Sequence, residues 1–251
     1  MRLVTDTGIV LVRELRPTWR DPFSVLFSIV QPLIFLGLFG PLLAGTSDVP
    51  GDSLWQWFVP GILVMVALFG TSMTGSNLLY EMQTGSHERM TVTPLSRPAL
   101  LIGRALKEMV PLVVQAVLIV AVVLPFGFRL YPLGALVGLL ILAVLGVGLG
   151  ALSYALALAV RNQEWMFWMV QQTVVFPLLI LSGMLLPLDR APGWMVVASH
   201  VNPLTYVIEA ERALFAGDFG AAAVWQGAVA ALVAAVVGLL VGTRMMNRAT
   251  S

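Results

Sequence analysis

The sequence alternates long apolar stretches with shorter segments that hold nearly all of its charged residues. A helix that crosses the hydrocarbon core of a bilayer needs about 20 mostly apolar residues. Six stretches meet this requirement, approximately residues 23–43, 58–80, 109–128, 133–160, 165–186 and 221–243. The pattern predicts an all-α membrane protein with six transmembrane helices. We expect residues 1–251 to form one domain, because no internal repeat or low-complexity tract divides them.

The first 22 residues are too polar to cross a membrane, but they are amphipathic. At 100° per residue, five polar residues fall within about one quarter of a helical wheel. These are Arg2, Asp6, Arg13, Arg16 and Arg20. A helix of this kind lies in the membrane interface, and a disordered basic leader is the alternative. We expect no cleaved signal peptide, because charged residues precede the first long apolar stretch.

The basic residues are distributed unequally between alternate connections. Eleven of the fourteen Lys and Arg residues fall in the N-terminal segment, the 81–108 connection, the turn after the fourth apolar stretch and the C-terminal tail. The first connection on the opposite side, residues 44–57, holds Asp48 and Asp52 and no basic residue. Cytoplasmic loops carry the excess of Lys and Arg, so both termini are predicted to be cytoplasmic.

Two connections are too long to be simple turns. The cytoplasmic one, residues 81–108, begins polar and ends in a short stretch with helical character. The outer one, residues 187–220, contains large apolar side chains such as Trp194, Tyr206 and Phe215. Apolar residues in so long a connection indicate a re-entrant segment in the outer leaflet, rather than a solvated linker.

Composition excludes several classes of protein. The chain is 59% hydrophobic and 11% charged, against roughly 45–50% and about 25% for soluble domains, so a soluble enzyme is excluded. A net charge of +1 gives no reason to expect a nucleic-acid partner. The absence of cysteine excludes disulfides and thiol catalysis, and two histidines cannot form a metal cluster alone. We therefore predict no metal site and no catalytic residue.

The sequence also limits how transport could be energised. Lys107 is the only lysine and does not follow a Gly-rich turn, so the chain has no P-loop for ATP. No acidic residue lies clearly within a predicted span, which is unlike proton- or sodium-coupled carriers. The paired glycines Gly134 with Gly138, and Gly146 with Gly150, suit close helix packing better than a cofactor site.

Polar residues in the fifth span are candidates for a substrate route. Gln171, Gln172 and Thr173 form a cluster that either faces such a route or makes interhelical hydrogen bonds. Gln172, Phe176 and Leu179 share a helix face by their spacing. One hypothesis is that Gln172 and Phe176 contact substrate. Leu179 would then form an apolar plug with Leu178 and Leu181. The other hypothesis is that this face packs against other spans.

Three stretches resemble the type-2 ATP-binding-cassette exporter permeases, particularly the daunorubicin-resistance-like branch. They are YEMQTGSHERMTVTPLSRPALLIGRALK (residues 80–107), LSGMLLPLDRAPGW (181–194) and NPLTYVIEAERALFAG (202–217). The sequence departs from the family pattern at Gly85-Ser86, where Gly-Thr is common, and at Glu211, which precedes the usual Arg212. These departures weaken an assignment to a subfamily.

The resemblance implies a half-transporter in which two six-span permease chains, identical or homologous, meet in the bilayer. Two separate P-loop ATPase subunits would dock from the cytoplasm, and ATP and Mg would be bound only there. Residues 1–22 would form the connecting helix, 81–108 the coupling loop and 187–220 the outer cap. The residues expected to couple to the ATPase are Thr84, Gly85, Glu88, Arg89, Thr93 and Pro94. For Glu88, a solvated charge is the alternative.

The function implied is export of an amphipathic drug-like or hydrophobic compound across a bacterial inner membrane by a multi-pass permease subunit. Export of a lipid or a lipid-linked glycan by the same machinery is one alternative. A non-transporting membrane anchor or signalling subunit that uses the same ATPase contacts is another.

Overall fold

The computed structural model describes residues 2–20, 23, 28–44, 53–84, 97–161, 163–188 and 191–249. Within these ranges all regular secondary structure is helical. The helices are α1 (Arg2–Arg20), α3 (Val30–Ala44), α4 (Leu54–Gln83), α6 (Arg97–Lys107), α7 (Met109–Val123), the 3₁₀ helix η1 (Leu124–Phe126), α8 (Pro132–Ala159), α9 (Glu164–Leu181), α10 (Gly193–Val201), α11 (Pro203–Phe215) and α12 (Ala222–Ala249). The predicted all-α class is confirmed.

Among the described residues, five helical stretches are long and apolar enough to cross a membrane. They are Leu54–Gln83, Ile102–Phe126, Pro132–Ala159, Glu164–Leu181 and Ala222–Arg248. A shorter apolar helix, Val30–Leu42, lies in the first predicted span. The structure thus has five to six apolar helices of the kind that a multi-pass membrane protein requires, close to the six that the sequence predicts.

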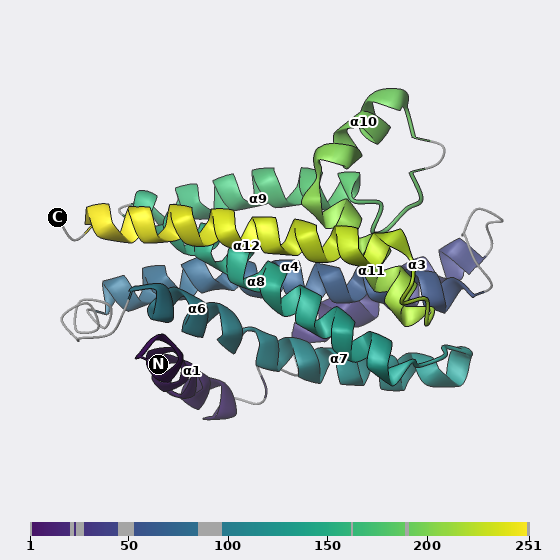
Figure 1. The fold of residues 1–251 in the computed structure, drawn as a ribbon, viewed down its shortest axis with the longest axis horizontal. Helices are drawn as coiled ribbons and strands as arrows, with labels where there is room; N and C mark the ends of the chain where they lie inside the picture. The colour runs from purple at the N-terminus through teal and green to yellow at the C-terminus, as the bar shows by residue number, and fades with distance from the viewer. Residues whose placement is uncertain are drawn as a thin grey trace.

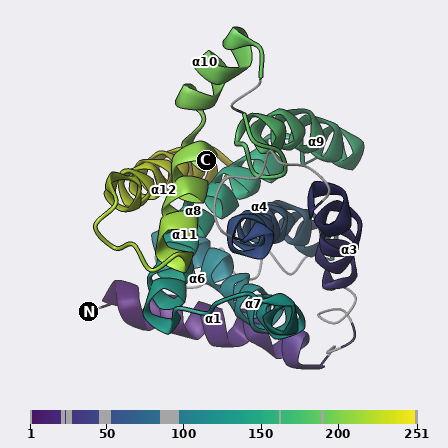
Figure 2. The same ribbon diagram turned by 90° about the vertical axis from the view of Figure 1, so that its right-hand side faces the viewer.

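Helix α4 runs through the middle of the bundle (Figures 1 and 2), between α3, α7, α8, α9 and α11. Apolar residues occupy all sides of the N-terminal half of α4, so this half can be buried on every side. Residues Trp57–Leu68 are buried without interruption. They form the main core with residues from α7, α8 and α11, such as Ile119, Leu142 and Ile208.

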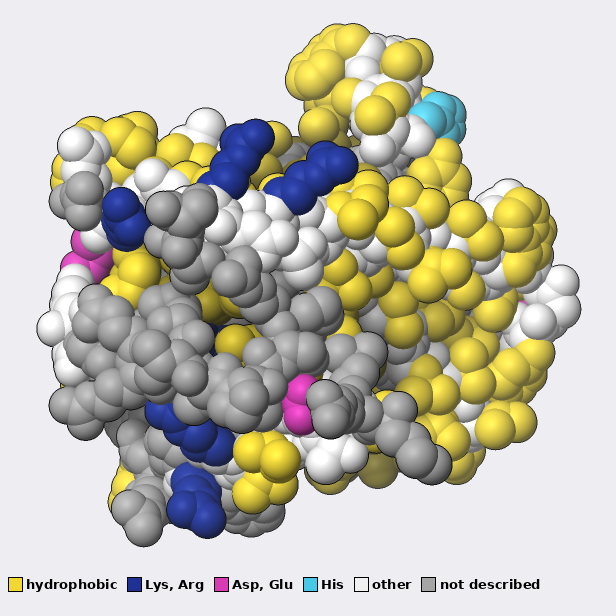
Figure 3. Space-filling view, turned by 60° about the vertical axis from the view of Figure 1, so that its left-hand side comes forward, with side chains coloured by type: hydrophobic (Ala, Val, Ile, Leu, Met, Phe, Trp, Pro, Cys, Tyr) yellow, Lys and Arg dark blue, Asp and Glu magenta, His cyan; other side chains and the backbone are white. Residues whose placement is uncertain are grey.

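The two ends of the bundle differ in character. Helices α1 and α6, the C-terminal end of α4 and the end of α12 lie together at one end (Figure 1). Lys and Arg side chains gather there, and hydrophobic side chains cover much of the rest of that view (Figure 3). The described residues thus place the N-terminal helix and the C-terminal tail at the same end, as a shared cytoplasmic side requires.

Helix α1 packs along α6 (Figure 2). Val10 is 1% exposed, and a Cβ added to Gly103 of α6 would lie 2.8 Å from the Cβ of Val10. The N-terminal segment is therefore an ordered helix, and the alternative of a disordered leader is wrong. Val4, Ile9 and Val12 are exposed. They do not share one narrow face, because Ile9 lies within the basic quarter of the helical wheel.

Glycines of α8 allow two other helices to approach closely. A Cβ on Gly134 or Gly138 would clash with Leu214 or Glu211 of α11, so the packing predicted for this pair is confirmed. Further along α8, Gly148 meets Gly238 of α12, and a Cβ on Gly238 would lie 2.7 Å from the carbonyl carbon of Gly148. These contacts fix α8 between α11 and α12.

Candidate coupling site and substrate route

The predicted coupling residues begin where α4 ends. Thr84 follows the last residue of α4, and its hydroxyl donates to the Tyr80 carbonyl, 3.2 Å away. The other predicted coupling residues lie outside the described residues. These are Gly85, Glu88, Arg89, Thr93 and Pro94. Of the predicted coupling residues, the structure therefore places Thr84, at the C-terminal end of α4.

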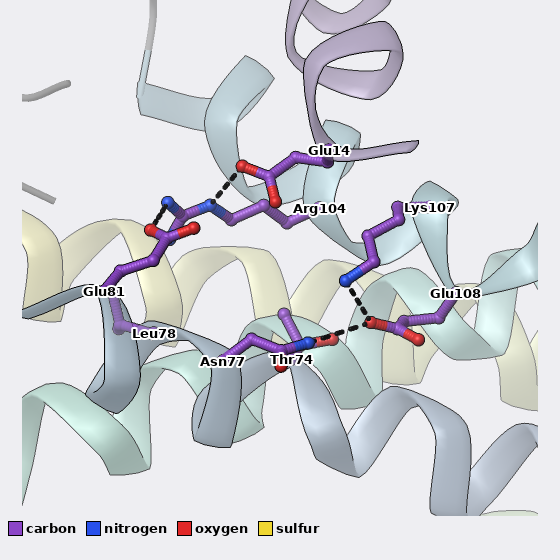
Figure 4. Close-up of a pocket in the computed structure, with 8 residues that line it drawn as sticks. All are labelled: Glu14, Thr74, Asn77, Leu78, Glu81, Arg104, Lys107 and Glu108. Atoms are coloured by element: carbon purple, nitrogen blue, oxygen red, sulfur yellow. Dashed lines mark hydrogen bonds and ion pairs between the residues drawn. The ribbon is translucent and has the colours of Figure 1, made fainter. Parts of the chain in front are cut away.

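A group of charged side chains lies near the C-terminal end of α4 and joins three helices (Figure 4). Arg104 of α6 places its Nε 3.6 Å from Oε1 of Glu14 in α1. Its Nη2 pairs with Oε2 of Glu81 in the last turns of α4. The Arg104 side chain is 5% exposed, against 12% for Glu14 and 18% for Glu81. We call Glu14, Arg104 and Glu81 the three-helix ion cluster.

A second pair lies beside this cluster (Figure 4). Lys107 Nζ is 3.3 Å from Oε1 of Glu108, and Asn77 Nδ2 of α4 donates to the same oxygen at 3.4 Å. The start of α7 is thereby tied to α4. The nearby Thr74 hydroxyl is buried and has no hydrogen-bond partner among the described residues.

An aromatic ring of α8 packs against the guanidinium group of the cluster. The Arg104 guanidinium carbon lies 5.3 Å from the ring centroid of Tyr154 in α8, and that ring is fully buried. A cation over an aromatic face is stabilised by the ring quadrupole. Arg104 therefore contacts α1, α4 and α8 at once, although its own helix is α6.

The buried ion pairs of this cluster hold three helices together. Removing one partner of a buried ion pair leaves an uncompensated charge, so the paired helices resist separation. Among the described residues, no group of three His, Asp or Glu side chains is placed to hold a metal ion.

The sequence pattern does not indicate that these charged residues contact one another. Glu14 carried a signal, because on the wheel of α1 it falls outside the basic quarter, one turn after Val10. A carboxylate on that side of an amphipathic helix needs a partner. The identity of the partner, Arg104, depends on tertiary packing.

The predicted route residues of α9 differ in exposure. Gln172 is exposed and Phe176 is 50% exposed, whereas Gln171 is 8% and Leu179 4% exposed. Leu178 and Leu181 are partly buried. Gln172 and Phe176 thus face out of the single chain, as a surface that meets a second chain or a substrate would. Leu179 belongs to the packed core, which supports the packing hypothesis at that position.

Helices α10 and α11 pack against the C-terminal end of α9 and cover it. Asn202 Nδ2 donates to the Leu178 carbonyl at 2.7 Å, and the Thr205 hydroxyl donates to the Leu181 carbonyl at 3.4 Å. The Asn202 carboxamide oxygen also accepts from the Leu204 N–H and caps α11. The predicted outer segment therefore contains two helices closely joined to the fifth span.

Arg212 links α11 to the N-terminal end of α4 through hydrogen bonds. Its Nε donates to the Trp57 carbonyl at 3.2 Å, and its Nη2 donates to the Gly183 carbonyl at 2.9 Å. The guanidinium also lies 3.9 Å from the Trp57 ring centroid. Gly183 has a φ of +69°, a conformation that favours glycine, and this turn brings its carbonyl to Arg212.

The described geometry defines a class of protein: a multi-pass helical membrane protein with an ion cluster at one end and a cap of two short helices at the other. The ABC-2 type transporter family model matches residues 5–216, and the chain belongs to that family. The resemblance noted in the sequence is thereby confirmed.

Three related proteins agree with this family assignment. The chain is 28% identical to the daunorubicin resistance ABC transporter permease protein DrrB1 of Streptomyces coeruleorubidus, over 79% of this chain and 71% of that protein. It is 33% identical to the putative transport permease ycf38 of Cyanophora paradoxa, over 78% and 69%. It is 27% identical to a probable doxorubicin resistance ABC transporter permease protein, DrrC, of Mycobacterium tuberculosis (strain CDC 1551 / Oshkosh), over 86% and 79%.

Proposed function

We propose that this chain is the membrane subunit of an ATP-driven exporter that moves an amphipathic, drug-like compound out of a bacterial cell. Two such chains would pair in the inner membrane, with both termini cytoplasmic. Two separate P-loop ATPase subunits would bind the 81–108 segment and supply the energy. Relatives named as daunorubicin and doxorubicin resistance permeases support a drug-like substrate.

The observation that carries the proposal is the three-helix ion cluster at the exit of the coupling segment. Glu81 lies three residues before Thr84, so a force on the segment acts directly on the Glu81–Arg104 pair. Arg104 would transmit this force to Glu14 of α1 and to the Tyr154 ring of α8, because its guanidinium contacts both. A permease without its own ATPase needs a mechanical connection of this kind.

Transport by the assembled complex tests the proposal. Inverted membrane vesicles that contain this chain and a P-loop ATPase subunit that co-purifies with it should accumulate doxorubicin when ATP is added. Vesicles with either subunit alone should not. Accumulation driven by a pH gradient in vesicles with this chain alone would overturn the ATP-driven mechanism. ATP-dependent flipping of a lipid or a lipid-linked glycan without doxorubicin uptake would favour that alternative. A complex that hydrolyses ATP but transports neither would favour the anchor.

A paired substitution tests where the ATPase binds. Glu88→Ala combined with Arg89→Ala should leave the chain inserted and dimeric but reduce substrate-stimulated ATP hydrolysis. The matched control is Glu209→Ala with Arg129→Ala, which removes the same charges from two exposed side chains at the other end of the bundle. Equal stimulation in the two double variants would exclude Glu88 and Arg89 from the ATPase contact.

A further inference from the structure

A cavity of about 210 Å³ opens between the start of α3, the middle of α4 and α7. Its wall includes Gln31, Met65, Phe69, Gly70, Met73 and Gln115. These residues are separate from the three-helix ion cluster and from the predicted route residues of α9. With both termini cytoplasmic, the cavity lies in the middle and the cytoplasmic half of the membrane.

One side of the cavity is polar but uncharged. Gln115 is 6% exposed, and its Nε2 donates to the hydroxyl of Ser28 across the cavity wall. Gln31 is exposed and lies at the same wall. Each carboxamide offers both donor and acceptor atoms. No Asp, Glu, Lys, Arg or His is among the residues that line the cavity, so a ligand with a charge buried there would have no counter-ion.

The opposite side is apolar and suits an aromatic ring. Met65 is buried, Phe69 is partly buried and Met73 is 40% exposed. Thioether and phenyl groups make favourable contacts with aromatic rings. The volume is below the roughly 300–1,000 Å³ of pockets that enclose a whole drug-sized molecule. The cavity would therefore hold one part of a ligand, and the rest would extend past Met73 and Gln31.

A larger groove between α7 and α8 provides a contrast. It measures about 440 Å³ and is lined by apolar residues alone, among them Val117, Val120 and Leu136. An acyl chain fills such a groove without any polar contact to select it. The cavity beside Gln115 is different because amide groups face the apolar wall, which is the combination that an amphipathic ligand matches.

We propose that this cavity is a binding site through which the permease accepts substrate from the inner leaflet. Its ligand class is an uncharged ring system that carries carbonyl or hydroxyl groups, bound with the ring on Met65 and Phe69 and the oxygens toward Gln115 and Ser28. The inference rests on the proposed function and adds a substrate class and a first binding position to it.

Gly70 offers a way to fill the cavity without disturbing the fold. A Cβ added at Gly70 would meet nothing within 4 Å, although Gly70 lines the cavity. Gly37 of α3 is equally open and does not line it. Gly70→Leu should therefore occlude the site, and Gly37→Leu is a control with the same residue change on another apolar helix.

The experiment measures binding of 1,4-dihydroxyanthraquinone to the purified full-length chain in lipid nanodiscs. Probe fluorescence is followed, and the signal of empty nanodiscs is subtracted. We expect saturable binding that Gly70→Leu abolishes and Gly37→Leu leaves unchanged. Gln115→Leu should weaken binding about ten-fold, as for loss of one hydrogen bond in a buried site. Thermal unfolding of each variant verifies that the loss is not due to misfolding.

Two results would overturn the site: unsaturable partition into the nanodisc, or equal binding by folded Gly70→Leu and the parent chain. Binding needs no ATPase, so this outcome is independent of the transport test. ATP-driven doxorubicin uptake with normal probe binding by Gly70→Leu would reject the cavity but retain the exporter. Specific binding without uptake would retain the cavity and reject the exporter.

Discussion

Arg104 of α6 lies 3.6 Å from Glu14 of α1, measured from Nε to Oε1, and this pair joins the N-terminal helix to the bundle. The same guanidinium pairs with Glu81 of α4. Two carboxylates therefore share one buried cation. The guanidinium offsets only one of the two negative charges, but it presents several N–H donors toward both carboxylates.

Arg104→Met should destabilise the chain strongly, because it removes the cation and leaves Glu14 and Glu81 facing each other. We expect a loss of about 3–5 kcal/mol in the free energy of unfolding, as for other broken buried ion pairs. Unfolding of the detergent-solubilised protein measures the loss.

Lys107→Met is the control for this change, since it removes a cation whose described ion pair is with Glu108 alone. We expect less than half of the effect. Equal losses in the two variants would show that the three-helix ion cluster has no special role in stability.

Much of the helical framework could be predicted from sequence, because hydrophobic length is a local property. The stretch 58–80 lies within α4, which extends a few residues beyond both predicted ends, and the stretch 133–160 differs from α8 by one residue at each end. The stretch 23–43 is described as a helix only from Val30 to Ala44. Helix ends depend on caps and on neighbouring chain, which hydropathy does not record.

Contacts between helices were less predictable. The spacing of Gly134 and Gly138 indicated close packing, but not that α11 is the partner. Spacing placed Gln172, Phe176 and Leu179 on one face, yet Leu179 is buried in the main core and Phe176 is 50% exposed. A helical wheel gives the direction of a side chain and not what covers it.

Labelling of introduced cysteines tests the orientation, and the chain has no cysteine of its own. Asp218 and Thr84 are both exposed, and they follow α11 and α4 respectively. In intact cells, an impermeant maleimide should label Asp218→Cys and should label Thr84→Cys only after the membrane is opened. External labelling of Thr84→Cys would reverse the proposed topology.

Gly148→Ala should weaken the contact of α8 with α12. The added Cβ would lie 2.5 Å from the carbonyl carbon of Ala234, which is backbone and cannot rotate away. Overpacking of this kind costs about 1–3 kcal/mol. Thermal unfolding should show the loss for Gly148→Ala and none for Gly37→Ala, where the Cβ meets open space. A neutral Gly148→Ala would indicate that α12 shifts freely along α8.

Glu211→Met should stabilise the fold, which is unusual for a substitution at a fully buried residue. Glu211 is 0% exposed, and neither carboxylate oxygen has a hydrogen-bond partner among the described residues. The neighbouring Arg212 is directed instead to Trp57 and Gly183. Burial raises the pKa of Glu211 to about 8, so its carboxyl group is mostly uncharged at neutral pH. A buried polar group without a hydrogen bond costs about 1–3 kcal/mol, and an apolar side chain of similar volume removes that cost.

The matched control for Glu211→Met lies on the same helix, two residues earlier. Glu209 is exposed, so Glu209→Met is the same substitution at a carboxyl group that is already in contact with solvent. We expect the midpoint of thermal unfolding to rise for Glu211→Met and to stay within a degree or two for Glu209→Met. A clear fall for Glu211→Met alone would contradict the prediction and would mean that the carboxyl group makes a stabilising contact within the bundle formed by α4, α8, α11 and α12.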